Sequence, residues 1–475
     1  MDLESIRQID MTGAKPAALE LVAIYSSLGL LLVSCSDQDW VAGFAKLLWL
    51  ASVAGLSVMN FGAAFGVYVA SAAIYSVLHF KGWGSVFQRP DNFALAILLF
   101  SLGVTRFRPH YLLRSGWLGA GIVVFMVYSL AQMVLSGSMT RVDFAWHMRM
   151  FGLPFLVFLF LMSGSMTLKD LLSFFHVMIA IGLYMGIISI MERFSLYSYM
   201  IPPWIGDPNL NVSIEAGRSG GLLLQSEWNG FVLGLIYSII LASIYLTREN
   251  RWPKYIVAII CLLAIFFTYT RAAWLGAFVA SLLLLFNTSS LAKKEWMKKF
   301  AVLFSGFLVV AMLILFPSKT AMQRTQDEAT IYFRINLWSA GLKMMAEKAL
   351  FGHGFGKFRE RIYEYHEKVK GVPYTPIPRE GSVAHNTLIN ILVEQGLMGL
   401  TLYCLIFVLI FLKAKATINR FWPTCAPLWL ATFAAVYLIN TQFIAAYEPA
   451  TNFIFYGTMG FLIGSGKEFS TGKQI

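Results

Sequence analysis

Long apolar runs recur along the whole of this 475-residue chain, and they constrain its fold more than any other feature. Hydrophobic residues make up 58% of the sequence and charged residues only 13%, with a mean hydropathy of +0.66. A water-soluble domain of this size would not be so apolar, whereas a membrane-spanning helix needs about 20 mainly apolar residues. The pattern therefore predicts an all-α polytopic membrane protein.

About 14 transmembrane helices are predicted from these runs, with boundaries good to a few residues. The acidic N-terminal residues argue against a cleaved signal peptide, so the first run is interpreted as the first span. The predicted spans are 18–35, 40–58, 61–80, 93–105, 116–136, 150–165, 171–192, 229–247, 255–270, 273–288, 300–317, 396–412, 425–444 and 450–466.

Short loops rich in Lys and Arg predict the orientation of these spans, because such loops stay on the cytoplasmic side. All four strong basic clusters fall on one side of the 14-span arrangement, and both termini fall there too, which predicts cytoplasmic termini. Since the net charge of +12 comes largely from such loops, it does not indicate binding to nucleic acid. The clusters lie at 106–114, 248–254, 293–299 and 413–420.

The same arrangement divides the chain into four parts. Residues 1–228 form N-terminal transmembrane helices and an external loop, 229–317 central transmembrane helices, 318–384 a large external (periplasmic) loop, and 385–475 C-terminal transmembrane helices. In the large loop, Ile335, Trp338, Leu342 and Met345 follow helical spacing, and a glycine-rich turn follows at 352–356. We expect a small helical cap on the extracytoplasmic face.

The stretch Ala384–Gly399, AHNTLINILVEQGLMG, carries the strongest candidate for chemistry. His385 and Asn386 open an amphipathic helix that runs on into an apolar segment. The partial positive charge of a helix N-terminus disfavours protonation of an imidazole, and a neutral imidazole is what a general base requires. The alternative is a histidine of the membrane interface with its polar tip among lipid headgroups.

Three arginines are predicted to face the external side, where the positive-inside rule disfavours them. They are Arg218 in GRSGG, Arg271 in the tight turn TYTRAAW, and Arg334 at the start of the large-loop helix. A guanidinium group binds phosphate through two parallel hydrogen bonds, so a bound anion is one explanation. The alternatives are lipid phosphates or pairing with a carboxylate such as Glu227.

No metal or cofactor is predicted, because the sequence contains no His, Cys and carboxylate cluster with metal-ligand spacing. The four cysteines all lie in or at apolar segments, so no disulfide framework is predicted. His353, inside the glycine-rich turn, is interpreted as structural.

The order of these elements resembles the O-antigen ligase and Wzy-type polysaccharide polymerase superfamily over roughly residues 215–415. The most specific part is His-Asn, nine residues and then Gly-x-x-Gly entering a span, here His385-Asn386 with Gly396 and Gly399. Arg271, Arg334 with Trp338, and the Gly352–Phe358 turn support it. One departure is Trp228-Asn229, where the family often has Pro-Asn.

The resemblance implies a multi-pass protein of the bacterial inner membrane that transfers a glycan from an undecaprenyl-diphosphate carrier, with inversion and without a metal. Arg218, Arg271 and Arg334 would hold the diphosphate and stabilise its charge as it leaves. His385 would deprotonate the acceptor hydroxyl, and Asn386 would cap the helix or fix the imidazole. Trp338 would stack on sugars, and Asn229 would contribute to substrate binding.

The acceptor is either a glycan repeat unit, in a polymerase, or the lipid A core, in a ligase. The size of the protein favours polymerisation of O-antigen or exopolysaccharide units, with membrane lipid and a polysaccharide assembly complex as further partners. Two alternatives from other classes are a lipid-linked oligosaccharide transporter and a non-catalytic scaffold of envelope assembly. The transporter would have inverted repeats and charges near the bilayer midplane, for which the sequence gives no convincing pattern.

Overall fold

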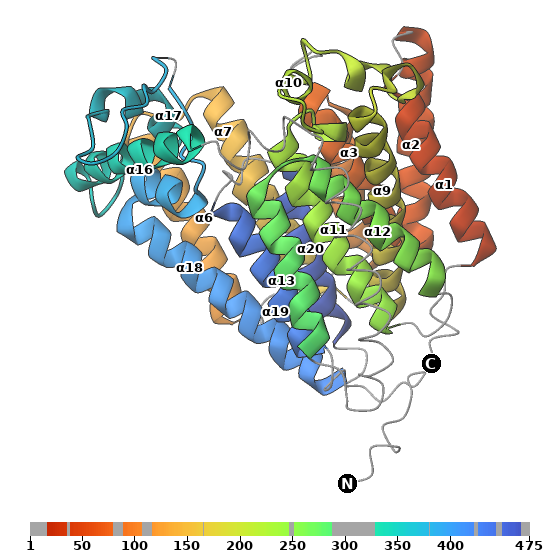
Figure 1. Ribbon diagram of the computed structural model, residues 1–475. Coiled ribbons are helices and arrows are strands. Elements are labelled where there is room, and N and C mark those ends of the chain that lie inside the picture. Colours follow the sequence, from red (N-terminus) through yellow and green to blue (C-terminus); the bar gives the residue numbers. More distant parts are fainter. Residues whose placement is uncertain are drawn as a thin grey trace.

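The computed structural model describes residues 17–35, 39–78, 89–106, 116–164, 166–246, 251–286, 328–379, 381–421, 426–442 and 449–466. Most of these residues are helical (Figure 1). The α-helices are α1 (Ala18–Val33), α2 (Asp39–Met59), α3 (Phe61–Leu78), α4 (Pro90–Thr105), α6 (Trp117–Leu135), α7 (Arg141–His147), α8 (Leu153–Ser163), α9 (Leu168–Arg193), α10 (Val212–Glu215), α11 (Ser226–Leu246), α12 (Arg251–Phe267), α13 (Arg271–Phe286), α16 (Ala329–Glu347), α17 (Lys357–Arg361), α18 (Thr387–Phe421), α19 (Ala426–Thr441) and α20 (Pro449–Ser465). A π-helical turn, η5 (Met148–Gly152), joins α7 to α8, and the short 3-10 turns are η6 (Tyr197–Tyr199), η7 (Pro203–Gly206), η8 (Gly221–Leu223) and η9 (Ile362–Tyr365).

The predicted all-helical membrane fold is confirmed, and each predicted span within the described ranges coincides with a helix. The count of 14 is not confirmed. Within the part of the chain that the structure describes, six helices are long and apolar enough to cross a membrane, and other predicted spans correspond to shorter apolar helices such as α1 and α4. The predicted span 300–317 lies outside the described residues. The six are Trp40–Met59, Trp117–Leu135, Arg141–Ser163, Leu168–Arg193, Ser226–Ile244 and Thr387–Ile418.

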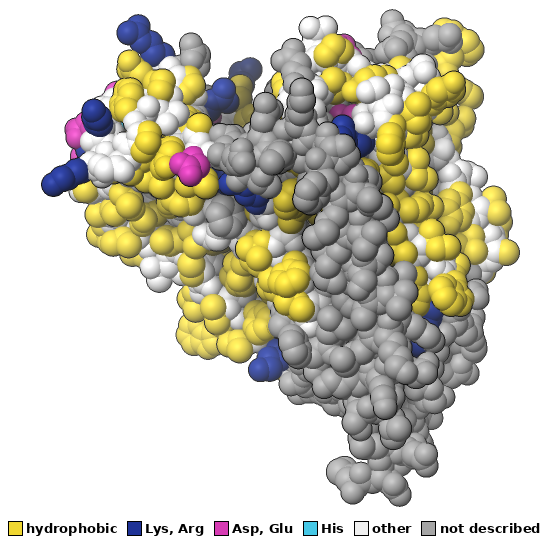
Figure 2. Space-filling model, viewed as in Figure 1, with side chains coloured by type: hydrophobic (Ala, Val, Ile, Leu, Met, Phe, Trp, Pro, Cys, Tyr) yellow, Lys and Arg dark blue, Asp and Glu magenta, His cyan; other side chains and the backbone are white. Residues whose placement is uncertain are grey.

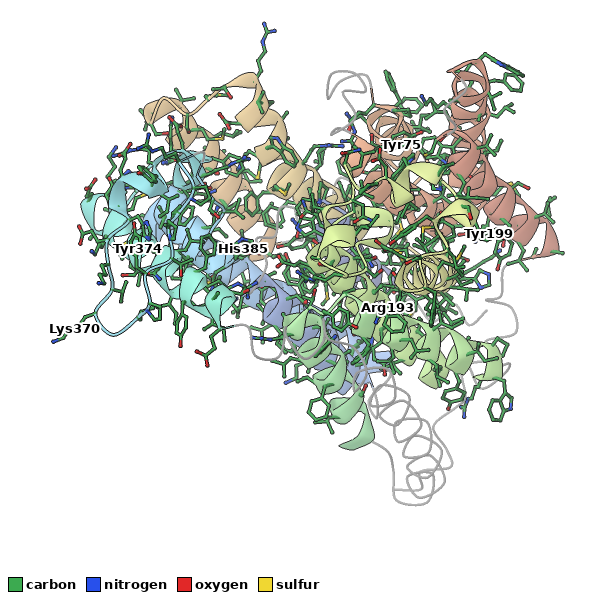
Figure 3. All side chains as sticks on the ribbon, turned by 45° about the horizontal axis from the view of Figure 1, so that its top comes forward. Tyr75, Arg193, Tyr199, Lys370, Tyr374 and His385 are labelled. Carbon is green, nitrogen blue, oxygen red and sulfur yellow. The ribbon has the colours of Figure 1, made fainter. Side chains whose placement is uncertain are left out.

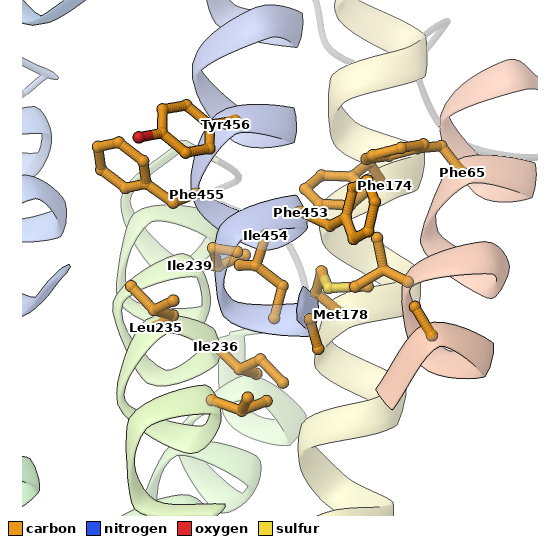
Figure 4. Close-up of a cluster of buried hydrophobic side chains, with 14 of the residues drawn as sticks. Phe65, Phe174, Met178, Leu235, Ile236, Ile239, Phe453, Ile454, Phe455 and Tyr456 are labelled. Atoms are coloured by element: carbon orange, nitrogen blue, oxygen red, sulfur yellow. The ribbon is translucent and has the colours of Figure 1, made fainter. Parts of the chain in front are cut away.

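The core of the bundle forms around α20, whose residues are buried along its whole length. This helix packs against α8, α3, α9 and α11, and side chains from α3, α9, α11 and α20 meet in one apolar cluster (Figure 4). Phe174 of α9 stacks on Phe461 of α20, with ring centroids 5.3 Å apart. A helix that is apolar on every side is buried in this way when neighbours surround it.

The outer helices leave apolar side chains exposed. Leu405 and Val408 of α18 and Val123 and Val127 of α6 are about half exposed or more. Figure 2 shows charged side chains gathered on the cap, at the upper left, above a flank on which hydrophobic side chains predominate. These exposed apolar faces suit the hydrocarbon of a bilayer, in agreement with the membrane assignment.

A helical cap forms in the large loop as predicted, from α16, α17 and η9, and α16 packs on the start of α18 (Figure 1). Leu342, one of the residues whose spacing predicted α16, is 47% exposed. Apolar residues occupy two overlapping stripes of this helix, and the surface provided by Phe358, Ile362 and Val393 buries the neighbouring stripe. The buried residues are Asn336, Leu337, Ala340, Gly341 and Met344.

The glycine-rich turn joins the cap to α18 through exchanged backbone hydrogen bonds. Gly396 interrupts α18 with φ 68° and ψ −172°, so the carbonyls of Val393 and Glu394 lose the helical donors four residues ahead. These carbonyls instead accept from the N–H groups of His353 (3.0 Å) and Gly354 (2.8 Å). The freed N–H groups of Leu397 and Met398 donate to the carbonyls of Ala349 (2.8 Å) and Leu350 (3.2 Å).

The buried carboxylate of Glu394 and the imidazole of His353 strengthen this junction. Glu394 Oε1 accepts the N–H of Gly356 at 3.0 Å, at the start of α17. The ring of His353 contacts the carbonyl of Met344 (2.6 Å) and the guanidinium of Arg361 (3.1 Å). These contacts agree with the structural interpretation of His353.

We predict that Gly396→Ala destabilises the protein. A Cβ at residue 396 would lie 2.3 Å from the carbonyl oxygen of Leu350, and its φ is one that L-residues rarely adopt. The expected loss is about 1–3 kcal/mol, seen as a lower thermal denaturation temperature of the detergent-purified protein. The matched control is Gly121→Ala, where a Cβ would make only an ordinary 3.7 Å contact with Ile406. Equal denaturation temperatures for the two variants would contradict the conclusion that the backbone hydrogen bonds around Gly396 stabilise the protein.

The predicted topology places the cap outside the cell and the far end of α18 in the cytoplasm. In a background without the native cysteines, Glu360→Cys on the cap should react with a membrane-impermeant maleimide added to spheroplasts. Lys415→Cys should react only after the membrane is permeabilised. The same contrast is expected for a cysteine at position 295, which lies outside the described residues. The reverse labelling pattern would place the cap in the cytoplasm.

Candidate active site

His385 lies on the side of the cap that faces the bundle, whereas Lys370 lies at the cap's outer edge (Figure 3). The backbone of His385 is in the left-handed conformation, with φ 47°, and its side chain is 27% exposed. The indole N–H of Trp338 donates to the carbonyl of Ala384 at 2.8 Å. This bond fixes the backbone immediately before His385, so Trp338 has a positioning contact. Stacking of its ring on sugars stays a prediction.

Asn386 caps α18, which is one of the two roles predicted for it. Its Oδ1 accepts the N–H of Ile389 at 3.0 Å, the usual bond of an N-cap side chain. Its Nδ2 lies 3.3 Å from Oε1 of Gln442, which directly follows α19. The cap therefore fixes where α18 begins, and with it the position of His385 just before the helix.

Glu227, in the first turn of α11, lies between the histidine and one of the arginines. Its Oε2 is 3.6 Å from Nδ1 of His385, and its Oε1 is 3.6 Å from Nη2 of Arg334. Both distances exceed that of a direct hydrogen bond, so the interactions are electrostatic contacts in this state. All three side chains are between a fifth and about a quarter exposed, which leaves the site open to a ligand.

Arg218 and Arg271 lie at the turn between α12 and α13. Arg218 donates from Nε to the carbonyl of Thr268 (3.0 Å) and from Nη2 to Oγ1 of Thr270 (2.9 Å). The hydroxyl of Thr270 in turn lies 3.2 Å from the carbonyl of Ser226, the residue before Glu227. Arg271 directly follows Thr270 in the chain and is the first residue of α13.

The charges of this region act on one another. Arg218, Arg334 and His385 all interact electrostatically with Glu227. Burial lowers the pKa of Arg334, the Glu227 carboxylate raises it, and the positive charge of Arg271 lowers it further. The guanidinium groups of the three arginines outnumber the Glu227 carboxylate, so the region carries excess positive charge. It can attract an anion and hold it near His385.

A second buried carboxylate shapes the loop that carries Arg218. Glu192, near the end of α9, is 4% exposed. Its two oxygens accept from Asn211 Nδ2 (2.6 Å), Ser219 Oγ (2.9 Å) and the N–H groups of Gly220 (3.2 Å) and Gly221 (2.7 Å). Ser219 also donates its backbone N–H to the carbonyl of Phe267 at 3.0 Å. These bonds hold Arg218 against the turn between α12 and α13.

Asn229 is placed differently from the other predicted site residues. It is fully buried on α11, and its Nδ2 donates to Ser189 Oγ at 2.9 Å. A Cβ on Gly221 would lie within 3 Å of its amide, so the side chain packs tightly under the Arg218 loop. These contacts give Asn229 a packing role, while its Oδ1 is buried without a hydrogen-bond partner. A contribution of Asn229 to substrate binding stays a prediction.

Sequence reasoning treated Glu227 only as a pairing partner and did not identify Glu192 or Glu394. A usable signal existed, because glutamates within or beside apolar spans are rare and need partners. Among the residues that the structure describes, no group of three or more His, Cys, Asp and Glu side chains could hold a metal ion.

The fold and the site together define an integral membrane protein with a cationic, histidine-containing site beneath a helical cap. A family model described as O-antigen ligase matches residues 256–404 and confirms the resemblance to the O-antigen ligase and Wzy-type superfamily over that part of the chain. The matched region contains Arg271, Arg334 and His385, whereas Arg218 and Glu227 precede it. A comparison with curated proteins gives no significant match.

Proposed function

We propose that the protein is an inverting, metal-independent glycosyltransferase of the bacterial inner membrane. Its donor is a glycan linked to undecaprenyl diphosphate, and the acceptor is a hydroxyl group at the periplasmic face. The observation that carries the proposal is the convergence of His385, Arg334 and Arg218 on Glu227, with the charge of Arg271 acting on Arg334. The family match over residues 256–404 supports the reaction class.

Each part of the site has a task in this reaction. The arginines bind the diphosphate and stabilise the negative charge that develops on it as the glycosidic bond breaks. His385 accepts the proton of the attacking hydroxyl. The apolar outer faces of the helices accommodate the polyprenyl chain within the bilayer.

Polymerisation of O-antigen or exopolysaccharide repeat units is the favoured reaction, since the predicted external loop 318–384 and the large number of apolar segments are on the large side for a ligase. Transfer to the lipid A core is the second candidate, because the matching family model is described as O-antigen ligase. The glycans that accumulate after deletion of the gene distinguish the two. Single lipid-linked repeat units indicate a polymerase, and long lipid-linked chains lacking core indicate a ligase.

His385→Ala should lower glycan transfer by about 10²–10⁴-fold, because it removes the proposed general base. The assay uses membranes with a lipid-linked donor and an acceptor, and transferred glycan is measured by mass spectrometry. Immunoblotting confirms equal amounts of inserted protein. The control is His176→Gln on α9, far from the cap in sequence, which should retain transfer. Normal transfer by His385→Ala would favour the transporter or scaffold alternative.

Arg271→Lys should lower transfer by about 10- to 150-fold, and Arg271→Ala should lower it further. Lysine keeps the charge but loses the planar two-point contact with phosphate, and a charge-assisted hydrogen bond is worth about 1.5–3 kcal/mol. The same membrane assay measures the effect, with Arg359→Lys on the exposed cap surface as the control.

Two outcomes would contradict the arginine mechanism. If Arg271 only contacts lipid headgroups, lysine substitutes freely, because lysine reaches the membrane interface equally well. Loss of wild-type transfer on addition of EDTA would instead assign the leaving-group charge to a metal ion. We expect full wild-type activity with EDTA.

A further inference from the structure

Glu227 lies between two groups to which the proposed function gives opposite tasks. One carboxylate oxygen is 3.6 Å from the imidazole of His385, the proposed base, and the other is 3.6 Å from the guanidinium of Arg334, which contacts the leaving group. These three side chains come from different elements: α11, the residue pair before α18, and α16. Folding therefore brings the base and the leaving-group site to the same carboxylate.

A carboxylate among arginines has two opposing effects on an anionic ligand. It attracts the guanidinium groups and keeps them in place, and it repels the diphosphate that would bind to them. A bound diphosphate carries more negative charge than one carboxylate and presents several oxygens to Arg334. It therefore competes with Glu227 for this guanidinium.

We propose that Glu227 is a positioning residue that links donor binding to the activation of His385. When the donor diphosphate takes over Arg334, the carboxylate is left to accept a hydrogen bond from Nδ1–H of His385. That bond fixes the tautomer with an unprotonated Nε2, which then faces the acceptor hydroxyl. The proposal rests on the proposed function and adds an order of events, with the base completed after the donor binds.

The transfer step balances without any further reactant. The acceptor oxygen forms a bond to the anomeric carbon, and the bond from that carbon to the phosphate oxygen breaks. Its electron pair stays on the diphosphate, whose charge the arginines stabilise. The hydroxyl proton moves to Nε2 of His385, and the Glu227 carboxylate stabilises the resulting imidazolium while remaining ionised itself.

The decisive variant is Glu227→Gln, because it removes the charge and leaves the side-chain shape almost unchanged. It should lower kcat about 10-fold or more, since the imidazolium loses its counter-charge. It should also bind the donor more tightly, because a negative charge that repels the diphosphate is gone. Donor affinity is measured without acceptor, on the full-length protein in nanodiscs, with the lipid-linked diphosphate glycan as the probe.

A lower kcat together with a higher donor affinity distinguishes this positioning role from a merely structural one. A variant that merely disturbs the site would bind donor more weakly and also turn over more slowly. Glu227→Asp keeps the charge on a side chain that is one methylene shorter, so it should lower kcat without improving donor affinity. The control is Glu367→Gln, whose carboxylate pairs with Lys343 on the cap surface, and neither quantity should change there.

The double variant Glu227→Gln, His385→Ala tests whether Glu227 acts through the histidine. Its kcat should be no lower than that of His385→Ala alone, because two groups that act as a unit are not additive. A multiplicative loss would overturn the inference, as would an unchanged kcat or weaker donor binding in Glu227→Gln. If the wild-type protein transfers no glycan, the proposed function fails and the inference fails with it. An active wild type with unaffected Glu227→Gln overturns the inference alone.

Discussion

The exchange of backbone hydrogen bonds at Gly396 is the interaction on which the rest of the site depends. An interrupted helix at the edge of a membrane would leave two carbonyls and two N–H groups without partners, at considerable cost. The chain supplies all four partners from one segment, Ala349–Gly354. Because Gly352 and Gly396 lack side chains, the two backbones approach closely enough for these bonds to form. The cap is thereby attached to α18 by main-chain contacts, and the positions of Arg334 and Trp338 follow from that attachment.

Buried or partly buried glutamates hold the segments around the candidate site in place. Glu192 collects four donors and shapes the loop that presents Arg218. Glu394 holds the start of α17 against α18. Glu227 lies at the centre of the site itself. Glu192 and Glu394 act on the scaffold through their hydrogen bonds, and Glu227 acts within the site, where its carboxylate interacts with Arg218 and Arg334.

The sequence was sufficient to predict where the apolar helices of the described ranges lie, because a segment that crosses a membrane has few alternatives to the α-helix. It also singled out His385 from its position at a helix start and the three arginines from their predicted external placement, and the structure brings His385, Arg218 and Arg334 near Glu227. The spacing of Ile335, Trp338, Leu342 and Met345 predicted the helix α16, but two apolar stripes overlap there and only the partner surface decides which of them is buried. It also gave Glu227 only a possible pairing role, because the groups that a side chain meets across the bundle depend on how the helices pack. A one-dimensional pattern shows spacing, whereas the contact with His385 depends on a chain segment more than 150 residues away.

The bond between the indole of Trp338 and the carbonyl of Ala384 has a mechanical consequence. Trp338 follows Arg334 by one helical turn on α16. The backbone just before His385 is therefore hydrogen-bonded to the same helix that carries Arg334. Arg218 and Arg271 belong instead to the bundle, on either side of the turn between α12 and α13. A shift of α16 relative to the bundle would therefore act on Arg334 and on the backbone before His385 together, and it would alter the separation of Arg334 from Arg218 and Arg271.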